Sequence, residues 1–165
     1  MSNLDSLFDK LRSQPKTPAE HWEAKKREWI EDLEKLRATL SEWLKRGADE
    51  GLLTLIPRTV ELDEEDVGTY EAPALDLQFN ANGPRVIKIE PVAMRVVGVI
   101  PTPGVRILGA VGRVDLRCGP ARAMLLRRAP GRWQFVGVDH GFSSGEYVVD
   151  LSQDSLGEVI DELLG

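Results

Sequence analysis

Cysteine and histidine are scarce in this chain, and their scarcity limits the chemistry that it can carry. The 165 residues include one cysteine, Cys118, and two histidines, His21 and His140. One cysteine cannot form an internal disulfide or a cysteine-based zinc site. Two histidines leave few ways to build a metal site or an acid–base pair. We therefore expect no metal ion and no cofactor.

Long apolar runs are also absent. The chain has no stretch of about 18 apolar residues, so no membrane-spanning helix is predicted. The first residues, MSNLDSLFDKLRSQPKT, lack the basic region followed by an apolar core that marks a secretory signal. Together with the low cysteine content, these features predict a cytoplasmic protein with no membrane partner.

The residues that are present are typical of a soluble globular protein, with 42% hydrophobic and 29% charged side chains. Residues 1–16 are expected to form a short amphipathic helix and a linker, because Leu4, Leu7, Phe8 and Leu11 share one helical face before a break. Residues 17–165 are expected to form a single α+β domain. The first helix could dock elsewhere as a peptide or pack on its own domain.

A long helix is predicted from Pro18 to about Arg46. The segment Thr17–Glu20 has the spacing of a capping box, with proline at the first helical position. Apolar residues recur along one side of this helix, and their stripe is wider than a coiled-coil seam. We expect this stripe to pack on a sheet, with a homodimer or partner contact through residues 22–44 as the alternative. The central seam consists of Trp29, Leu33, Leu36, Leu40 and Trp43.

From residue 52 the pattern becomes β-rich, with seven runs divided by Gly-, Pro- and Asp-containing turns. The turns are too short for parallel crossovers, so the runs predict an antiparallel meander. The chain ends in an amphipathic helix after a candidate N-cap, Ser152. The predicted fold class is α+β: a long N-terminal helix packed on an antiparallel sheet of about six or seven strands, with a C-terminal helix.

Charge is divided into three blocks along the sequence. Residues 1–80 hold 11 basic and 18 acidic residues, residues 81–135 hold 10 basic and 2 acidic residues, and residues 136–165 hold 7 acidic residues and no basic ones. The whole chain has a net charge of −6, so the middle block, with +8, is cationic within an acidic protein. Its candidate partner-binding residues are Arg113, Arg117, Arg122, Arg127, Arg128 and Arg132.

Three interpretations of these arginines are open. The acidic C-terminal helix and the acidic segment 61–66 could neutralise them inside the fold. They could form a surface for an acidic protein partner, because guanidinium groups pair with carboxylates in a bidentate manner. They could also contact the phosphates of a nucleic acid through residues 106–132.

Catalytic motifs are weak. Residues 141–145, GFSSG, match the spacing of a nucleophile elbow, but no histidine follows Ser143 and the next residues indicate a strand. The segment around Asp115, GRVDL, resembles the metal-binding aspartate strand of restriction-endonuclease-like nucleases, but the following strand, ARAMLLRR, contains no acid. An enzyme would require Asp115, Asp139, His140 and Ser143 to converge in space.

These observations favour a non-enzymatic cytoplasmic protein that binds another protein. Such a role suits an inhibitor or immunity-type protein, or an accessory subunit of a larger bacterial complex. The arginine-, glycine- and alanine-rich composition is typical of a bacterial source, and the small acidic α+β build is similar in kind to bacterial immunity and antitoxin proteins. The alternative is a nucleic-acid-binding protein that uses residues 106–132, including a catalytically inactive nuclease-like domain.

Overall fold

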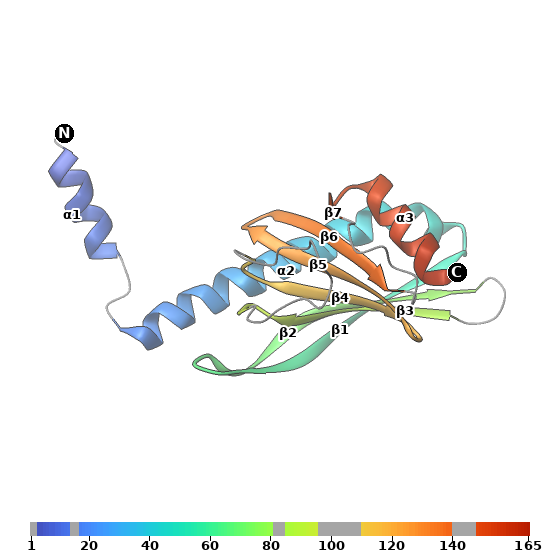
Figure 1. The fold of residues 1–165 in the computed structure, drawn as a ribbon, viewed down its shortest axis with the longest axis horizontal. Coiled ribbons are helices and arrows are strands. Elements are labelled where there is room, and N and C mark those ends of the chain that lie inside the picture. The colour runs from blue at the N-terminus through green and yellow to red at the C-terminus, as the bar shows by residue number, and fades with distance from the viewer. Residues whose placement is uncertain (1–2, 14–16, 81–84, 96–109, 140–147) are drawn as a thin grey trace.

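The computed structural model describes residues 3–13, 17–80, 85–95, 110–139 and 148–165. It confirms the predicted fold class: a long N-terminal helix, a seven-stranded antiparallel sheet and a C-terminal helix (Figure 1). A short helix, α1 (Asn3–Ser13), precedes these elements and lies apart from them in the figure. None of the residues of α1 is buried.

The long helix, α2 (Pro18–Asp49), begins at the predicted position and ends three residues later than expected. The Thr17 hydroxyl accepts a hydrogen bond from the Glu20 amide at 3.1 Å, which satisfies one of the free donors at the helix start. At 1.5 Å per residue the helix is about 48 Å long, and its N-terminal part extends beyond the sheet.

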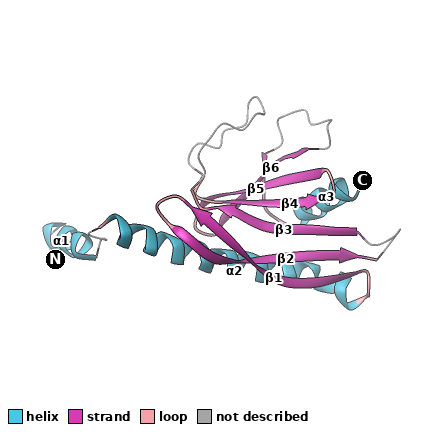
Figure 2. Cartoon of the chain, turned by 90° about the horizontal axis from the view of Figure 1, so that it is seen from below, coloured by secondary structure: helices cyan, strands magenta, loops and turns pink. Residues whose placement is uncertain are grey.

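The sheet is a simple meander, in which each strand pairs with the next strand in sequence. Figure 2 shows the strands side by side, with α2 running beneath them. Short turns between most neighbouring strands cannot cross over the sheet, whereas β3 and β4 pair antiparallel across a longer connection, residues 94–112. The strands are β1 (Leu53–Glu64), β2 (Gly68–Phe79), β3 (Arg85–Ala93), β4 (Arg113–Cys118), β5 (Ala121–Ala129), β6 (Arg132–Asp139) and β7 (Val148–Asp150).

The C-terminal helix, α3 (Gln153–Leu164), begins at the predicted N-cap. Ser152 and Ser155 form a reciprocal capping box, because each side chain accepts from the other residue's amide. Leu156, Val159 and Leu163 of α3 are buried in the same core as the residues of α2. Both helices therefore cover one face of the sheet, α2 beside β1 and β2, and α3 beside β4 to β6.

The apolar seam of α2 faces this core, as the wide stripe predicted. Trp29, Leu33, Leu36 and Leu40 are each at most 5% exposed. This close packing leaves no room for a side chain at Gly112, where an added Cβ would lie 2.2 Å from the Trp29 ring. The seam itself is therefore not open to a second copy of α2. A dimer through other faces of residues 22–44 stays a prediction.

Candidate functional site

The two faces of the central strands differ in character, because successive side chains of a strand point to opposite sides. Ile87 and Ile89 of β3 and Leu116 of β4 point to the helices and are buried. Their neighbours in sequence point to the other side, which we call the outer face. Lys88 of β3 and Arg117 of β4 lie on this outer face and are exposed.

Three cations lie directly opposite one another across β3, β4 and β5. The register pairs Lys88 with Arg117, and Arg117 with Arg122. Residues paired in this way share a face, and neighbouring strands are about 4.8 Å apart. All three side chains are exposed. We call Lys88, Arg117 and Arg122 the cationic row.

The register brings an acid to each end of the cationic row, because Asp76 of β2 pairs with Lys88 and Asp139 of β6 pairs with Arg122. Arg117 lies 3.8 Å from a Glu90 carboxylate oxygen, and the Arg117 side chain is 53% exposed. Within the part of the chain that the structure describes, Lys88 and Arg122 form no ion pair. Like charges placed directly opposite on a sheet destabilise it. The two like-charge pairs, Lys88 with Arg117 and Arg117 with Arg122, therefore carry an electrostatic cost that an external anion would relieve.

Two acids near the cationic row, Asp76 and Glu90, are held by another arginine, Arg58 of β1. Its Nη2 atom lies 2.8 Å from an Asp76 oxygen and 3.1 Å from Glu90 Oε1. The hydrogen bond to Asp76, followed by smaller effects of Glu90, raises the pKa of Arg58 against the opposing effect of burial. Glu90 therefore divides its charge between Arg58, which is close, and Arg117, which is more distant.

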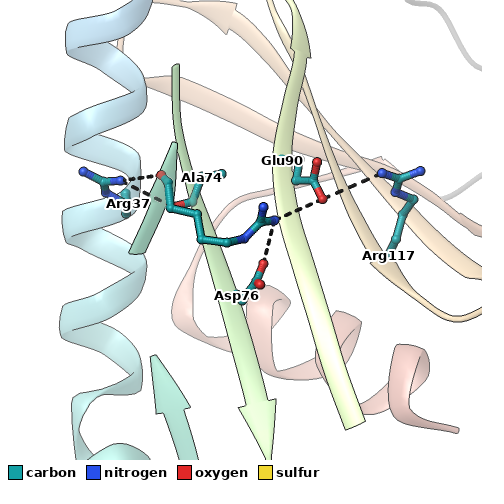
Figure 3. A network of polar contacts seen from close by, with 6 residues as sticks. Arg37, Ala74, Asp76, Glu90 and Arg117 are labelled. Carbon is teal, nitrogen blue, oxygen red and sulfur yellow. Dashed lines mark hydrogen bonds and ion pairs between the residues drawn. The ribbon is translucent and has the colours of Figure 1, made fainter. Parts of the chain in front are cut away.

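This network also connects the outer face to the long helix. Arg37 of α2 donates from Nη1 to the carbonyl oxygens of Arg58 and Ala74, at 3.0 and 3.3 Å. Figure 3 shows the chain of contacts from Arg37 to Arg117. Arg37 thereby fixes the backbone of β1 and β2 against α2, and this holds the acids in place beside the row.

Two of the sequence-predicted arginines are bound by their own neighbours on the outer face. Arg113 donates from Nε and Nη2 to both oxygens of Asp115, at 2.8 and 3.0 Å. Asp115 is buried by this contact and is 7% exposed. Arg128 donates from Nε to the side-chain oxygen of Gln134 at 3.1 Å. These contacts fit a structural role within β4, β5 and β6.

Arg127 lies in the interior and is 3% exposed. It donates from Nε to Asp32 and from Nη2 to Glu28, both on α2, so its charge is neutralised inside the fold. Its side chain points inward by the alternation of β5, in which Ala123 and Leu125 also face the core. A buried side chain cannot contact a partner in this conformation, and we leave Arg127 out of the proposed surface. The sixth arginine, Arg132, is exposed at the start of β6.

The acidic segments contribute unequally to neutralisation. Asp66 pairs with Arg95 at 2.8 Å, and the buried Glu64 accepts from the Met94 and Arg95 amides. The helix α3 packs on the face opposite to the cationic row. Internal neutralisation therefore accounts for Arg95, Arg113 and Arg127, whereas the row stays exposed.

The candidate catalytic residues are only partly described. Asp115 is engaged by Arg113, while His140, Ser143 and the side chain of Asp139 lie outside the described residues. No group of three or more His, Cys, Asp or Glu side chains suited to a metal ion occurs in the described ranges. None of the described helices is long and apolar enough to span a membrane.

Sequence reasoning missed Lys88 as a member of the site. Lys88 lies 25 residues before Arg113, and only the strand register brings it beside Arg117. The alternation in RVIKIE, residues 85–90, could have placed Lys88 on a polar face. Comparison with protein-family models, curated proteins and solved structures found no match for the chain.

Proposed function

We propose that this chain is a non-enzymatic protein-binding module, and that the cationic row binds an acidic surface of a protein partner. The observation that carries the proposal is the juxtaposition of Lys88, Arg117 and Arg122 on three adjacent strands, where Arg117 has one ion pair at 3.8 Å and the other two have none in the described part of the chain. Carboxylates on a partner would neutralise these charges, and two arginines can hold them in a bidentate manner. Such a contact contributes to partner choice and association rate.

The spacing of the row suits a regular acidic surface. The strands that carry its cations are about 4.8 Å apart. Carboxylates on neighbouring strands share this spacing, and those on successive turns of a helix are separated by about 5.4 Å. A cytoplasmic inhibitor, an immunity-type protein or an accessory subunit of a bacterial complex would use such a surface to recognise one protein.

A nucleic acid is the second candidate, because three exposed cations could also contact successive phosphates. The charge of the whole molecule argues against it. The chain has a net charge of −6 and a pI near 5.0, and α3 alone exposes Asp154, Glu158, Asp161 and Glu162. These acids would repel an extended polyanion. A compact acidic patch on a protein can contact the cationic row without approaching α3.

The proposal is tested by affinity capture with the full chain, using a lysate of the source organism with and without nuclease. We expect a stoichiometric protein that is captured equally in both samples and is released as salt increases. Capture that disappears after nuclease treatment would replace the proposal with nucleic-acid binding. If nothing is captured in either sample, the binding role is contradicted.

A further inference from the structure

The short helix α1 has an apolar face that its own domain does not cover. Leu4, Leu7, Phe8 and Leu11 lie on this face and are 45–60% exposed. Four large apolar side chains on one side of an 11-residue helix form a docking motif of the helix-in-groove type. The fold needs none of them, because no residue of α1 is buried.

The same chain carries a groove of matching length between α2 and the strands β6 and β7. It has a volume of about 440 Å³ and includes Lys35, Leu36, Trp43, Arg132, Trp133 and Leu151 in its lining. On α2 its lining runs from Asp32 to Trp43, which is about 16 Å along the helix axis. The 11 residues of α1 also span about 16 Å.

Charges at one end of the groove set a direction for the helix that docks there. The Gly131 amide donates to Asp32 at 3.0 Å, so Arg132 lies at the same end of the groove as Asp32 and Lys35. Lys35 and Arg132 are exposed, and neither forms an ion pair in the described part of the chain. This cationic end can pair with an acid in the first turn of a docked helix.

The charge order of α1 fits this direction. Its acids, Asp5 and Asp9, precede its bases, Lys10 and Arg12. A helix that runs parallel to α2 places Asp5, in its first turn, at the end of the groove that holds Lys35 and Arg132. If α1 folded back along its own α2, it would run antiparallel and place Lys10 and Arg12 at the cationic end instead.

The linker also disfavours the groove of the same chain. Five residue steps separate Ser13 from Pro18 and can span at most about 17 Å. The middle of α1 lies about 8 Å further along the chain. The middle of α1 can therefore lie at most about 25 Å from Pro18, even with no turn between the helices. Leu36, in the lining of the groove, lies about 27 Å from Pro18 along α2, so the middle of α1 does not reach it.

We propose that α1 docks into the α2–β6 groove of a second copy of this chain, parallel to the partner's α2. Reciprocal docking of both α1 helices closes a symmetric dimer. This surface is separate from the cationic row on the outer face, so the two proposals can fail independently.

The experiment is analytical ultracentrifugation of the full chain over a roughly hundredfold range of concentration. We expect a concentration-dependent monomer–dimer equilibrium in the wild type, and a monomer throughout for Phe8→Asp. Phe8 is exposed in the single chain, so the Phe8→Asp monomer should have the same thermal midpoint as the wild-type monomer. Ser6→Asp adds the same charge on the polar face of α1 and should keep the dimer.

A charge exchange tests the direction of docking. Lys35→Glu should raise the dimer dissociation constant roughly tenfold, because an attraction becomes a repulsion at two equivalent sites. Adding Asp5→Lys to Lys35→Glu should restore most of the affinity. A wild type that stays monomeric, a dimer that survives Phe8→Asp, or a double variant that is weaker than Lys35→Glu would each overturn the proposal.

Discussion

Arg127 shows how a single residue in a cationic segment can belong to the core. Its guanidinium group bonds to Asp32 and Glu28 of α2, and its backbone amide and carbonyl bond to residues 112 and 111. The Trp29 ring lies 5.9 Å from its guanidinium carbon. The side chain therefore connects β5, the segment before β4, and the long helix. Removing it would leave the buried Asp32 carboxylate without its main counter-charge.

We predict that Arg127→Met destabilises the fold by about 3–5 kcal/mol. The measurement is the free energy of unfolding in urea. Arg122→Met serves as the matched control and should change this free energy by no more than about 0.5 kcal/mol, since Arg122 is exposed. Adding Asp32→Leu to Arg127→Met should recover much of the loss, because no buried charge is then left unpaired. Equal losses in the two single variants would contradict the structural role.

Tyr70 is a second buried polar residue with a measurable consequence. Burial raises the pKa of its hydroxyl well above the ordinary value, and its hydrogen bond to the Glu64 carboxylate raises it further. Above about pH 10 an unfolded tyrosine loses its proton, while the folded one keeps it. Stability from Tyr70 is therefore present below pH 10 and is lost as the pH rises above that value.

The free energy of unfolding should lose up to about 1.4 kcal/mol for each pH unit above the pKa of tyrosine in the unfolded chain. Unfolding free energies at about pH 8 and pH 11 measure it. In Tyr70→Phe the difference between the two free energies should shrink by this amount, since the variant has no hydroxyl to titrate. An identical pH dependence in the wild type and Tyr70→Phe would refute this account of the Glu64–Tyr70 contact.

At the scale of elements, α1 and α2 differ in how firmly they belong to the fold. The helix α2 buries four residues of its seam on the sheet, whereas α1 buries none. The contact between Arg95 and the Trp22 ring, at 4.6 Å, attaches part of the N-terminal half of α2 to the end of β3. Residues 17–165 therefore contain the stabilising contacts of the described core.

We predict that a chain lacking residues 1–16 unfolds with the same free energy as the full chain, to within about 0.5 kcal/mol. The comparison is made by urea unfolding at a protein concentration at which the full chain is monomeric, because dimerisation would add its own stabilisation. Thr17 stays in place as the N-cap of α2. A loss of 2 kcal/mol or more, on the order of one core contact, would show that α1 is part of the domain.

The elements of this fold could be predicted because local signals in the sequence agree with the tertiary structure. Thr17 and Ser152 begin helices as their capping patterns predict, and the seven β-rich runs are seven strands. The limit of one strand depends on a detail of pairing, because β3 ends at Ala93 and its register with β4 shifts after Pro91. Proline cannot donate a ladder hydrogen bond, so it weakens a strand at that point.

The candidate site was harder to predict, because it depends on strand register and on which side chains are buried. The sequence groups six arginines within residues 113–135, but the structure buries Arg127 and pairs Arg113 with Asp115. Lys88 lies far away in sequence and is brought to Arg117 only by pairing of β3 with β4. Alternation predicts which face a side chain takes, but it does not predict which residue lies opposite on the next strand.

The whole molecule carries its charges in an asymmetric arrangement. The cationic row lies on the outer face of the sheet, and the acidic exposed side of α3 lies on the helix-covered face. Such separation produces a field that orients an acidic partner toward the row during approach. Because exposed charges are screened over about 10 Å at 0.1 M salt, the association rate should fall as salt increases.

The most direct measurement of the central claim is affinity capture with three forms of the full chain after nuclease treatment. The forms are the wild type, Arg117→Gln/Arg122→Gln and the control Lys45→Gln, which removes an exposed charge on α2. We predict that the wild type and Lys45→Gln retain the same stoichiometric protein, and that the double variant loses it without a lower thermal midpoint. Equal retention by all three forms would contradict the proposal that the cationic row is the binding surface.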